Sequence, residues 1–496
     1  MDAIIQALAT LGTIENLCLL CAGTAVGIFI GAMPGLSVNM GLALLFPVTF
    51  SVGGIGGIVM LLGIYCGAIY GGSITAILLR TPGTPASAAT ALDGYPLAMI
   101  KGQPGRALSI STTASLFGGV FSTFCLVLFA PMLAKVALQF SKPEYFALAV
   151  FGISMITSVS NGSILKGIIG CLIGLFIATI GLDAMSGMER FTLGTLYLSG
   201  GVSFMPILIG LFALTQVFVN VEENYKREQV KQKLKIDSVL PTYADFKLTA
   251  STLIRSSCIG TFIGCVPGTG GDISSWISYD QAKRWAKDKS QFGKGDPRGI
   301  AASESGNNAI VGGAFIPVLT LGIPGDGATA IILGALMVHG LQPGPLLFVD
   351  HAVDVYAIFI GMMAANIVMG LMGYSLIRVF VKVVNVPRVY LLPIITVMAV
   401  LGTYSYANSM YDVFIMLASG IIGYLMYKTG MGVPGVIIGI ILGSLAEQNF
   451  TGSLLMSDGS LSIFMTNPIC AIFLVLSLIS LLSPLYKGTL SKMIKH

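Results

Sequence analysis

The sequence is poor in charged residues. Only 10% of its 496 residues are Asp, Glu, Lys or Arg, whereas 55% are hydrophobic, and the mean hydropathy is +0.87. A soluble domain usually carries about 25% charged residues. A deficit of this size leaves too little polar surface to cover a water-soluble body, so the composition excludes a soluble globular protein.

Several functional signatures are also missing. The sequence has no GxxxxGK[ST] phosphate-binding loop, which argues against direct use of ATP by this chain. No stretch combines basic residues with aromatics as a nucleic-acid groove does. Cys18 and Cys21 form a CxxC inside an apolar run, without a second pair or a nearby His. We expect them to pack as small hydrophobic side chains rather than to bind zinc.

Long apolar runs are what the sequence has instead. Four of them cover residues 108–134, 197–219, 358–381 and 461–482. About 20 residues of helix cross a hydrocarbon core roughly 30 Å thick. The runs lack the alternation of a transmembrane barrel. They therefore predict an all-α polytopic membrane protein with roughly 11–14 membrane segments.

The chain contains an internal repeat. GIFIGAMPG at 27–35 matches GTFIGCVPG at 260–268 at six of nine positions. Two further matches follow in the same order. In the first, Gly71-Gly72, Pro82-Gly83 and Ala86 correspond to Gly312-Gly313, Pro324-Gly325 and Ala328. In the second, Gln103-Pro104-Gly105 corresponds to Gln342-Pro343-Gly344. These matches predict a first transmembrane repeat at 1–221, a polar cytoplasmic linker at 222–247 and a second repeat at 248–496.

Charge placement predicts that the two repeats are inverted. Lys and Arg in short loops mark the cytoplasmic side. This rule places the linker and residues 283–298, 378–388 and 487–495 inside, and counting four spans back from the linker adds residues 93–106. The loops at 342–351, 402–411 and 447–460 contain no Lys or Arg. The repeat-equivalent loops 93–106 and 342–351 thus fall on opposite sides, as in an inverted-topology repeat.

Each repeat holds two Pro-Gly dipeptides inside apolar sequence. They are Pro34-Gly35, Pro82-Gly83, Pro267-Gly268 and Pro324-Gly325. Proline removes a backbone donor and glycine permits unusual dihedral angles, so a helix must stop at each dipeptide. We expect discontinuous or re-entrant helices. Hydropathy leaves open whether the pairs at 14–50 and 248–280 cross the membrane or re-enter.

Polar residues gather at these four breaks. In one interpretation the prolines only kink helices, and the small polar side chains pack against neighbours. Four paired breaks favour instead a central site, where half-helix N-termini bind an anion and freed carbonyls hold a cation. The candidate substrate-binding residues are Pro34, Gly35, Ser37, Asn39, Gly83, Thr84, Pro267, Gly268, Thr269, Gly270 and Gly325.

Few ionisable side chains lie near the breaks. Asp326 and Asp272 either coordinate a cation or orient hydrogen bonds, or else they cap helices. We take Asn307, Asn308 and Asp326 as candidate ligands of a Na⁺ ion. Arg80 either pairs with a substrate carboxylate or extends to the membrane interface. We expect no cofactor other than a coupling ion, Na⁺ or H⁺.

Three glycine- and proline-rich segments resemble a known family. They are GAMPGLSVNMGLALLFPVTF at 31–50, YGGSITAILLRTPGTPASAATALDGYP at 70–96 and SGNNAIVGGAFIPVLTLGIPGDGATAIILGAL at 305–336. They are similar to TctA, the large membrane subunit of the tripartite tricarboxylate transporters. This resemblance implies a permease of the bacterial inner membrane, not an enzyme, that acts with a small membrane subunit and a periplasmic solute-binding protein. It also implies carboxylate substrates such as citrate, with uptake driven by an ion gradient.

Two other function classes remain open. Intramembrane aspartyl proteases use Tyr-Asp on one helix and Gly-x-Gly-Asp on another. Tyr279-Asp280 and Ile323-Pro324-Gly325-Asp326 come close to this pattern, although Ile323 replaces the first glycine. A passive anion channel is the third possibility, because repeats and broken helices occur in channels as well.

Overall fold

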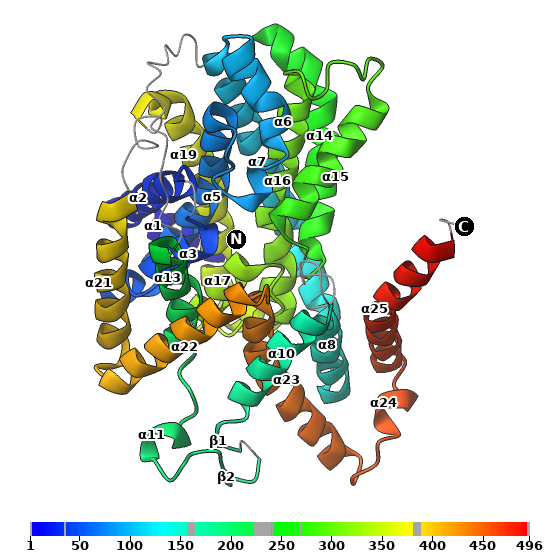
Figure 1. Cartoon of the computed structure of the whole chain (residues 1–496). Coiled ribbons are helices and arrows are strands. Elements are labelled where there is room, and N and C mark those ends of the chain that lie inside the picture. The colour runs from blue at the N-terminus through cyan, green and yellow to red at the C-terminus, as the bar shows by residue number, and fades with distance from the viewer. Residues whose placement is uncertain are drawn as a thin grey trace. The chain divides into compact units, whose positions relative to one another are not determined.

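The computed structural model describes residues 2–33, 36–155, 164–183, 185–222, 240, 242–267, 269–379 and 388–493. The described residues are mostly helical, and their strands are only β1 (Gly181–Leu182) and β2 (Glu189–Arg190), an antiparallel pair. The chain forms two compact units (Figure 1). Unit 1 comprises Met1–Ala134 and Phe212–Ser409, and unit 2 comprises Lys135–Leu211 and Met410–His496. Each unit therefore draws on both predicted halves.

Unit 1 contains all four Pro-Gly breaks. Its helices are α1 (Asp2–Leu11), α2 (Ile14–Gly31), α3 (Val38–Leu45), α4 (Val48–Val52), α5 (Gly54–Leu79), η1 (Pro85–Ser87), α6 (Thr90–Tyr95), η2 (Pro96–Ile100), α7 (Pro104–Ala137, which ends in unit 2), α13 (Thr215–Glu222), α14 (Tyr243–Cys265), α15 (Gly270–Trp285), α16 (Pro297–Leu321), α17 (Gly327–Val338), α18 (Leu347–Asp350), α19 (Ala352–Ser375) and α21 (Arg388–Ala407). Most of the predicted linker lies outside the described residues.

Unit 2 contains the remaining elements. Its elements are α8 (Lys142–Ser154), α10 (Ile164–Ala178), β1, β2, α11 (Leu196–Ser199), α12 (Phe204–Leu208), η3 (Ile209–Leu214, which ends in unit 1), α22 (Met410–Lys428), α23 (Pro434–Met456), α24 (Ile463–Thr466) and α25 (Pro468–Met493). Helices α10 and α23 pack closely, since a Cβ on Gly174 would lie 2.0 Å from the Val436 carbonyl oxygen.

The lengths and composition of the helices confirm the membrane assignment. Among the described residues, six helices are long and apolar enough to cross a bilayer, namely Ile14–Gly31, Gly54–Leu79, Pro104–Ala137, Phe204–Glu222, Ala352–Ser375 and Met410–Lys428. Five shorter apolar helices accompany them. The chain is therefore an all-α polytopic membrane protein. The total number of spans stays a prediction.

Helices α2 and α5 run parallel in close contact. A Cβ on Gly27 would lie 2.4 Å from the Ile64 carbonyl oxygen, and one on Gly31 would lie 2.1 Å from the Ala68 carbonyl oxygen. A step of four residues along one helix thus matches a step of four along the other. Small residues permit such close approach of helix backbones. Helices α14 and α16 repeat this packing, because Gly260 faces the Gly306 carbonyl and Gly264 faces the Ile310 carbonyl.

Parallel packing means that the intervening segment must return to its starting level. Along α15, Gly271 lies against Asn307 and Tyr279 lies against Gly299, so α15 runs antiparallel to α16. In the first half, Gly41 of α3 contacts Ile30 of α2. The pairs α2–α3 and α14–α15 are therefore helical hairpins. Whether they cross the membrane or re-enter it stays a prediction.

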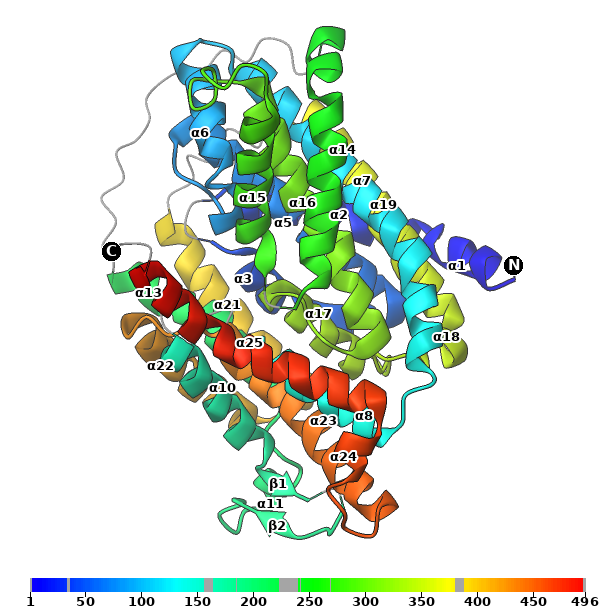
Figure 2. The same cartoon turned by 90° about the vertical axis from the view of Figure 1, so that its right-hand side faces the viewer.

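The repeat-equivalent loops 93–106 and 342–351 lie at opposite ends of α16. Asp93 contacts Gly299 near the start of α16, whereas the Gly344 amide donates to the Leu319 carbonyl near its end, at 2.9 Å. At 1.5 Å per residue, these two levels are about 30 Å apart. Figure 2 shows α6 at one end of unit 1 and α17 and α18 toward the other. This arrangement agrees with the predicted inversion.

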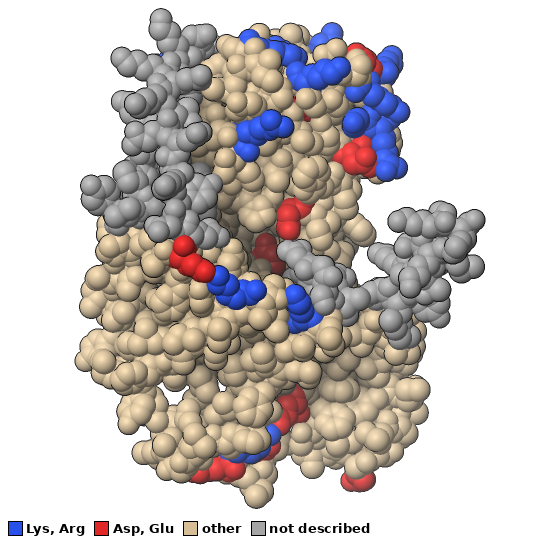
Figure 3. All heavy atoms as spheres, viewed as in Figure 1, with Lys and Arg blue, Asp and Glu red and all other residues tan. Residues whose placement is uncertain are grey.

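Three of the segments assigned to the cytoplasm, namely 93–106, 283–298 and the end of the linker, meet at one end of unit 1. Lys101 Nζ donates to the Gly295 carbonyl at 3.1 Å, and Arg106 forms an ion pair of 2.5 Å with Asp245. In the face drawn in Figure 3, Lys and Arg side chains gather at this end, over α6 and the segment that follows α15. The loops that the charge pattern assigns to one side of the membrane are therefore also close in space.

Candidate functional site

Within each half, the second break packs against the end of the first hairpin helix. A Cβ on Gly83 would lie 2.1 Å from the Gly31 carbonyl oxygen, and one on Gly325 would lie 3.0 Å from the Gly264 carbonyl oxygen. Gly325 and Gly264 are the repeat counterparts of Gly83 and Gly31. The same backbone contact thus occurs twice. The predicted residues Pro34, Gly35 and Gly268 lie outside the described part of the chain.

Contacts between the halves bring the four breaks together. A Cβ on Gly327, just after the last break, would lie 2.6 Å from Asn39 Nδ2, just after the first. A Cβ on Gly271, just after the third break, would lie 3.1 Å from the Ala86 Cβ, which follows the second. The carboxylates of Asp272 and Asp326 also lie close enough to interact electrostatically. The breaks therefore surround a common region of unit 1, beside the middle of α16.

Several predicted substrate ligands use their hydrogen bonds to complete helix ends. Ser37 caps α3 by accepting from the Met40 amide at 3.1 Å. The Thr269 hydroxyl donates to the Ile263 and Val266 carbonyls at the end of α14, at 2.6 and 2.9 Å. Such bonds satisfy backbone groups that a helix terminus leaves unpaired. Three more candidates shape the backbone: Thr84 is buried and caps η1, Pro267 is buried, and Gly270 has a φ of +64°.

Asp326 is a helix cap. One carboxylate oxygen accepts from the Thr329 amide at 2.8 Å and from the Thr329 hydroxyl at 2.7 Å. The other oxygen accepts from the Tyr65 hydroxyl at 3.2 Å. The capping alternative is thus present in the structure, and a role in cation binding stays a prediction. Arg80 is exposed, with its guanidinium 5.9 Å from the centre of the Tyr95 ring, and its role is likewise untested.

Asn307 is fully buried and unsatisfied. Neither its Nδ2 nor its Oδ1 has a hydrogen-bond partner in the structure, and its Oδ1 points at the Gly271 position, at the start of α15. An unpaired buried amide costs about 1–3 kcal/mol. Asn308 differs, because its Nδ2 donates to Ser115 Oγ at 2.9 Å. Asn308 and Asp326 thus bond to different neighbours, while the Asn307 side chain has no hydrogen-bond partner.

Sequence reasoning passed over Glu304, a fully buried carboxylate on α16. It accepts hydrogen bonds from the hydroxyls of Thr90 and Ser115 and from the Asn308 side-chain amide. Its sequence context, Ser-Glu-Ser, is typical of an exposed helix start. The available signal was its spacing of four residues from Asn308, which places both side chains on one helix face.

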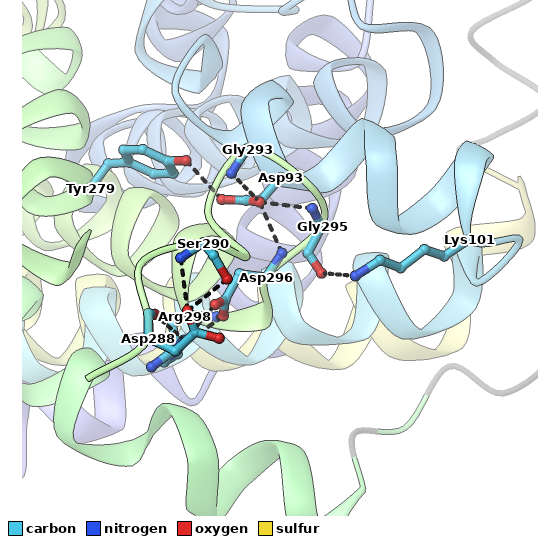
Figure 4. A network of polar contacts seen from close by, with 9 residues as sticks. All are labelled: Asp93, Lys101, Tyr279, Asp288, Ser290, Gly293, Gly295, Asp296 and Arg298. Atoms are coloured by element: carbon cyan, nitrogen blue, oxygen red, sulfur yellow. Dashed lines mark hydrogen bonds and ion pairs between the residues drawn. The ribbon is translucent and has the colours of Figure 1, made fainter. Parts of the chain in front are cut away.

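A second buried carboxylate, Asp93, organises the Lys- and Arg-rich end of unit 1 (Figure 4). One of its oxygens accepts from the backbone amides of Gly293, Gly295 and Asp296, each at 2.8 Å. The other accepts from the Tyr279 hydroxyl, also at 2.8 Å. These bonds tie the segment after the second break to the loop that connects α15 with α16.

Further polar contacts stabilise the same end. Arg298 pairs with Asp296 at 2.6 Å, and Asp288 accepts from the Ser290 hydroxyl and amide, which lower the pKa of the Asp288 carboxyl. Burial would raise the pKa of Asp245, but hydrogen bonds from Arg106 and Thr242 outweigh it, so this pKa is lowered. Ionised carboxylates thus help to hold these loops in place.

The two aspartates of the protease pattern have separate partners. Asp280 is half exposed and pairs with Arg284 at 2.6 Å, whereas Asp326 caps α17. A shared proton requires two carboxylates close together in a buried site. The geometry therefore gives no support to an aspartyl dyad.

The fold and this site define an all-helical membrane protein whose broken helices from two related halves meet in one unit. The family model described as "Tripartite tricarboxylate transporter TctA family" matches residues 17–443, and the chain belongs to this family. The family is that of a tricarboxylate transporter subunit, and membership implies a tripartite system with further subunits. The resemblance seen in the sequence is thereby confirmed.

Two proteins of Agrobacterium vitis are similar to this chain. The "Uncharacterized 52.8 kDa protein in TAR-I ttuC' 3'region" is 36% identical over 470 residues, which cover 95% of this chain and 93% of that protein. The "Uncharacterized protein in TAR-II ttuC' 3'region" is 34% identical over 233 residues, covering 47% of this chain and 96% of that protein. No solved structure matches the chain.

Proposed function

We propose that this chain is the permease subunit for secondary-active uptake of a tricarboxylate or a related organic carboxylate. It would work in the bacterial inner membrane by alternating access, coupled to a Na⁺ or H⁺ gradient. A small membrane subunit and a periplasmic solute-binding protein would be its partners. The observation that carries this proposal is the set of contacts that join residues beside the four breaks, with the unsatisfied amide of Asn307 next to the third break.

The start of α15 is the best-suited anion-binding position. Three helices of eight residues or more begin at the breaks, and two of them, α3 and α17, are capped by Ser37 and Asp326. The third, α15, has no side-chain cap. Uncapped N-terminal amides attract anions. A substrate carboxylate at α15 would accept from these amides and from Asn307 Nδ2, with Asn39 contributing from the α3 side.

A coupling cation would balance the negative charge at the site. Asp272 and Asp326 both lie near the start of a helix that faces the common region. A multiply charged anion entering beside two carboxylates meets repulsion and loses hydration. A cation bound first would offset both effects. We retain Asn307, Asn308 and Asp326, with freed backbone carbonyls, as its proposed ligands.

Reconstituted transport tests the proposal. The chain would be co-expressed with its proposed small membrane subunit, reconstituted into liposomes and supplied with the proposed binding protein. A panel of labelled tricarboxylates and dicarboxylates, including citrate, would then be offered with a Na⁺ or pH gradient. We expect accumulation that stops when ionophores collapse the gradient. Uptake that only equilibrates across the membrane would indicate a passive channel, and uptake of no carboxylate would overturn the proposal.

A further inference from the structure

The Lys- and Arg-rich end of unit 1 is built from segments of both halves of the chain. Helix α6 follows the second break, and the loop at residues 286–296 connects α15 with α16. This loop lies against η2, because a Cβ on Gly295 would lie 2.8 Å from the Leu97 amide nitrogen. Lys101, just after η2, donates to the Gly295 carbonyl at 3.1 Å. These contacts therefore join the segment after a break of the first half to the end of a hairpin of the second.

Asp93 of α6 is the residue that ties these segments together (Figure 4). Its side chain is buried, and one of its oxygens accepts from the loop amides of Gly293, Gly295 and Asp296. Gly293 and Gly295 have φ angles of +82° and +92°, a region that favours glycine. This conformation turns several amides toward one oxygen, as in the concavities where backbone amides bind anions. A single carboxylate thus holds the loop, so its displacement would free the loop in one step.

A buried apolar cluster accompanies this polar network. It consists of Ala89, Tyr279, Ala282, Phe292 and Ala302. The rings of Tyr279 and Phe292 pack edge to face, with their centres 5.7 Å apart. The Tyr279 hydroxyl also donates to Asp93, at 2.8 Å. Tyr279 therefore belongs to both the apolar cluster and the Asp93 network.

Positions along α16 place the cluster and the network between the breaks and this end of unit 1. Asn307 marks the level of the breaks, because its Oδ1 points at the Gly271 position. Ala302 of the apolar cluster and Gly299, which contacts the Asp93 carboxylate, precede Asn307 on the same helix. At 1.5 Å per residue, they lie about 8 Å and about 12 Å from the Asn307 level. A solute that leaves the breaks toward this end would meet the apolar cluster first and the Asp93 network next.

The two halves form a corresponding junction toward the other end of unit 1. There α17, which follows the fourth break, contacts α3 of the first half. His339 Nε2, at the end of α17, lies 3.1 Å from Thr49 Oγ1 in α4. At each end, a segment that follows the second break of one half thus meets the hairpin end of the other half. Alternating access requires a closure on either side of the binding site.

We propose that Asp93 is a positioning residue that holds a gate closed at the Lys- and Arg-rich end. The gate consists of α6, the end of α15 and the loop at 286–296. With the Asp93 bonds formed, these segments close the route from the breaks to this end, and release of the bonds opens the route between α6 and α15. The inference rests on the proposed transport function and assigns the residue that controls exit from the site.

Cysteine labelling tests this gate without any substrate. The full-length protein without its eight native cysteines would carry Ala302→Cys, in membrane vesicles of each orientation. A membrane-impermeant maleimide would be added outside. Ala302 is 0% exposed, so its labelling reports opening of the gate. The variants are Asp93→Ala and the milder Tyr279→Phe, which keeps the ring. Ser290→Ala is the matched control, because the Ser290 hydroxyl donates to Asp288 within the same loop.

The expected result is faster labelling from one side of the membrane. A hydrogen bond to a charged group changes an equilibrium by about tenfold or more. We therefore expect Tyr279→Phe to label about tenfold faster than wild type and Asp93→Ala faster still, only from the side of the Lys- and Arg-rich end. Ser290→Ala should label as slowly as wild type. Unchanged rates in Tyr279→Phe and Asp93→Ala, or acceleration from the opposite side, would overturn the proposal.

A second reporter cysteine distinguishes gate opening from general loosening of the fold. Ala357 on α19 is 1% exposed and lies outside the apolar cluster. We expect Ala357→Cys to stay unlabelled in the Tyr279→Phe variant, whereas Ala302→Cys becomes accessible. Equal acceleration at both positions would give Asp93 and Tyr279 a purely structural role and overturn the inference.

Solute efflux separates this inference from the proposed function. Liposomes with wild type, Tyr279→Phe or Ser290→Ala would be loaded with labelled citrate or another carboxylate that the wild type accumulates. A gate that closes poorly lets solute leak, so we expect faster efflux and lower accumulation in Tyr279→Phe alone. Wild-type transport with unchanged efflux and accumulation in Tyr279→Phe would overturn the gate and leave the permease function standing. Absence of any wild-type carboxylate transport would contradict the function, and with it the gate's role in transport, whatever the labelling shows.

Discussion

The Pro-Gly dipeptide has different structural effects in units 1 and 2. In unit 2, Pro434-Gly435 begins helix α23, where proline is well tolerated. In unit 1, Pro82-Gly83 and Pro324-Gly325 follow the ends of α5 and α16 and turn the chain back into the unit. The dipeptide starts a helix in one unit and interrupts membrane-embedded structure in the other.

Individual buried polar groups in the two units also differ. Glu144 of unit 2 accepts from the Ser141 amide at 3.0 Å and from the Asn467 side chain, which completes a helix start. In unit 1, Asn307 has no partner and Glu304 has no counter-charge among the described residues. Unsatisfied groups lower stability, and proteins keep them mainly where function requires them. Unit 2 also has such an atom, Arg190 Nε, so the contrast between the units rests mainly on the breaks. We expect unit 1 to carry the proposed transport chemistry.

The largest effect should come from filling a break. In Gly83→Ala, the new Cβ would lie 2.1 Å from the Gly31 carbonyl oxygen, so the two breaks of the first half must separate. A displacement of about 1 Å at a reacting or binding geometry can cost about 100-fold. We expect uptake to fall by about that factor while membrane insertion continues. Gly170→Ala in unit 2 is the control, because its nearest atom is 3.4 Å away. Equal uptake in both variants would remove the contrast between the units.

Two asparagines should respond in opposite ways. Asn307→Ala removes a buried amide without partners, so we expect stability to stay equal or rise while uptake falls strongly. Asn467→Ala in unit 2 removes a donor to Glu144, so we expect a loss of about 1–3 kcal/mol of stability with uptake per folded molecule retained. Thermal unfolding in detergent and uptake normalised to folded protein measure both. A stability loss in Asn307→Ala with normal uptake would assign Asn307 a packing role.

Two substitutions at Asp326 distinguish the effect of its negative charge from that of its helix cap. Asp326→Ser keeps a capping hydroxyl but removes the carboxylate, whereas Asp326→Ala also loses the cap, at a cost of about 1 kcal/mol. If Asp326 binds the coupling cation, both variants need more cation for half-maximal uptake, and only Asp326→Ala loses stability. Titration of uptake against Na⁺ and against pH measures this. An unchanged cation dependence in Asp326→Ser would leave Asp326 as a cap alone.

The smallest effects should come from exposed ion pairs. In Arg106→Gln, the pKa of Asp245 loses the ion pair that lowers it. The lowered pKa contributes stability that is present above the ordinary Asp pKa and is lost as pH falls through the folded-state pKa. Arg106 is 38% exposed, so solvent limits the effect to about 1 kcal/mol at neutral pH. We expect the variant and wild type to converge at acidic pH.

Arg190→Gln in unit 2 is the matched control for that variant. It removes partly exposed pairs with Glu447 and Asp183, and we expect a similarly small loss of stability. Uptake at neutral pH should stay normal in both variants. A large uptake defect in Arg190→Gln would show that unit 2 does more than support the fold.

Local chemistry explains what the sequence predicted well. Proline and glycine act on their own backbone, so the sequence correctly predicted that a helix ends before Pro82-Gly83 and before Pro324-Gly325. The repeat and the charge pattern placed loops 93–106 and 342–351 at opposite ends, as α16 has them.

Tertiary contacts explain what the sequence missed. The hydrogen bonds of Glu304 come from Thr90 and Ser115, which are 214 and 189 residues away along the chain. Asp93 depends in the same way on the Gly293 and Gly295 amides. Ser37 and Thr269 were correctly placed at breaks, but their hydrogen bonds go to nearby backbone.

The central claim, that breaks from both halves meet in one transport site, can be tested with a disulfide. In a functional background without the eight native cysteines, Ala86→Cys and Gly271→Cys would be combined, since their Cβ positions lie 3.1 Å apart. Disulfide-bonded Cβ atoms lie about 3.8 Å apart. The control pair in unit 2 is Ala178→Cys with Gly443→Cys, at 3.2 Å. We predict that both pairs cross-link, that only the Ala86–Gly271 pair blocks uptake, and that a reductant restores it. Failure of that pair to cross-link, or full uptake by the cross-linked protein, would contradict the account.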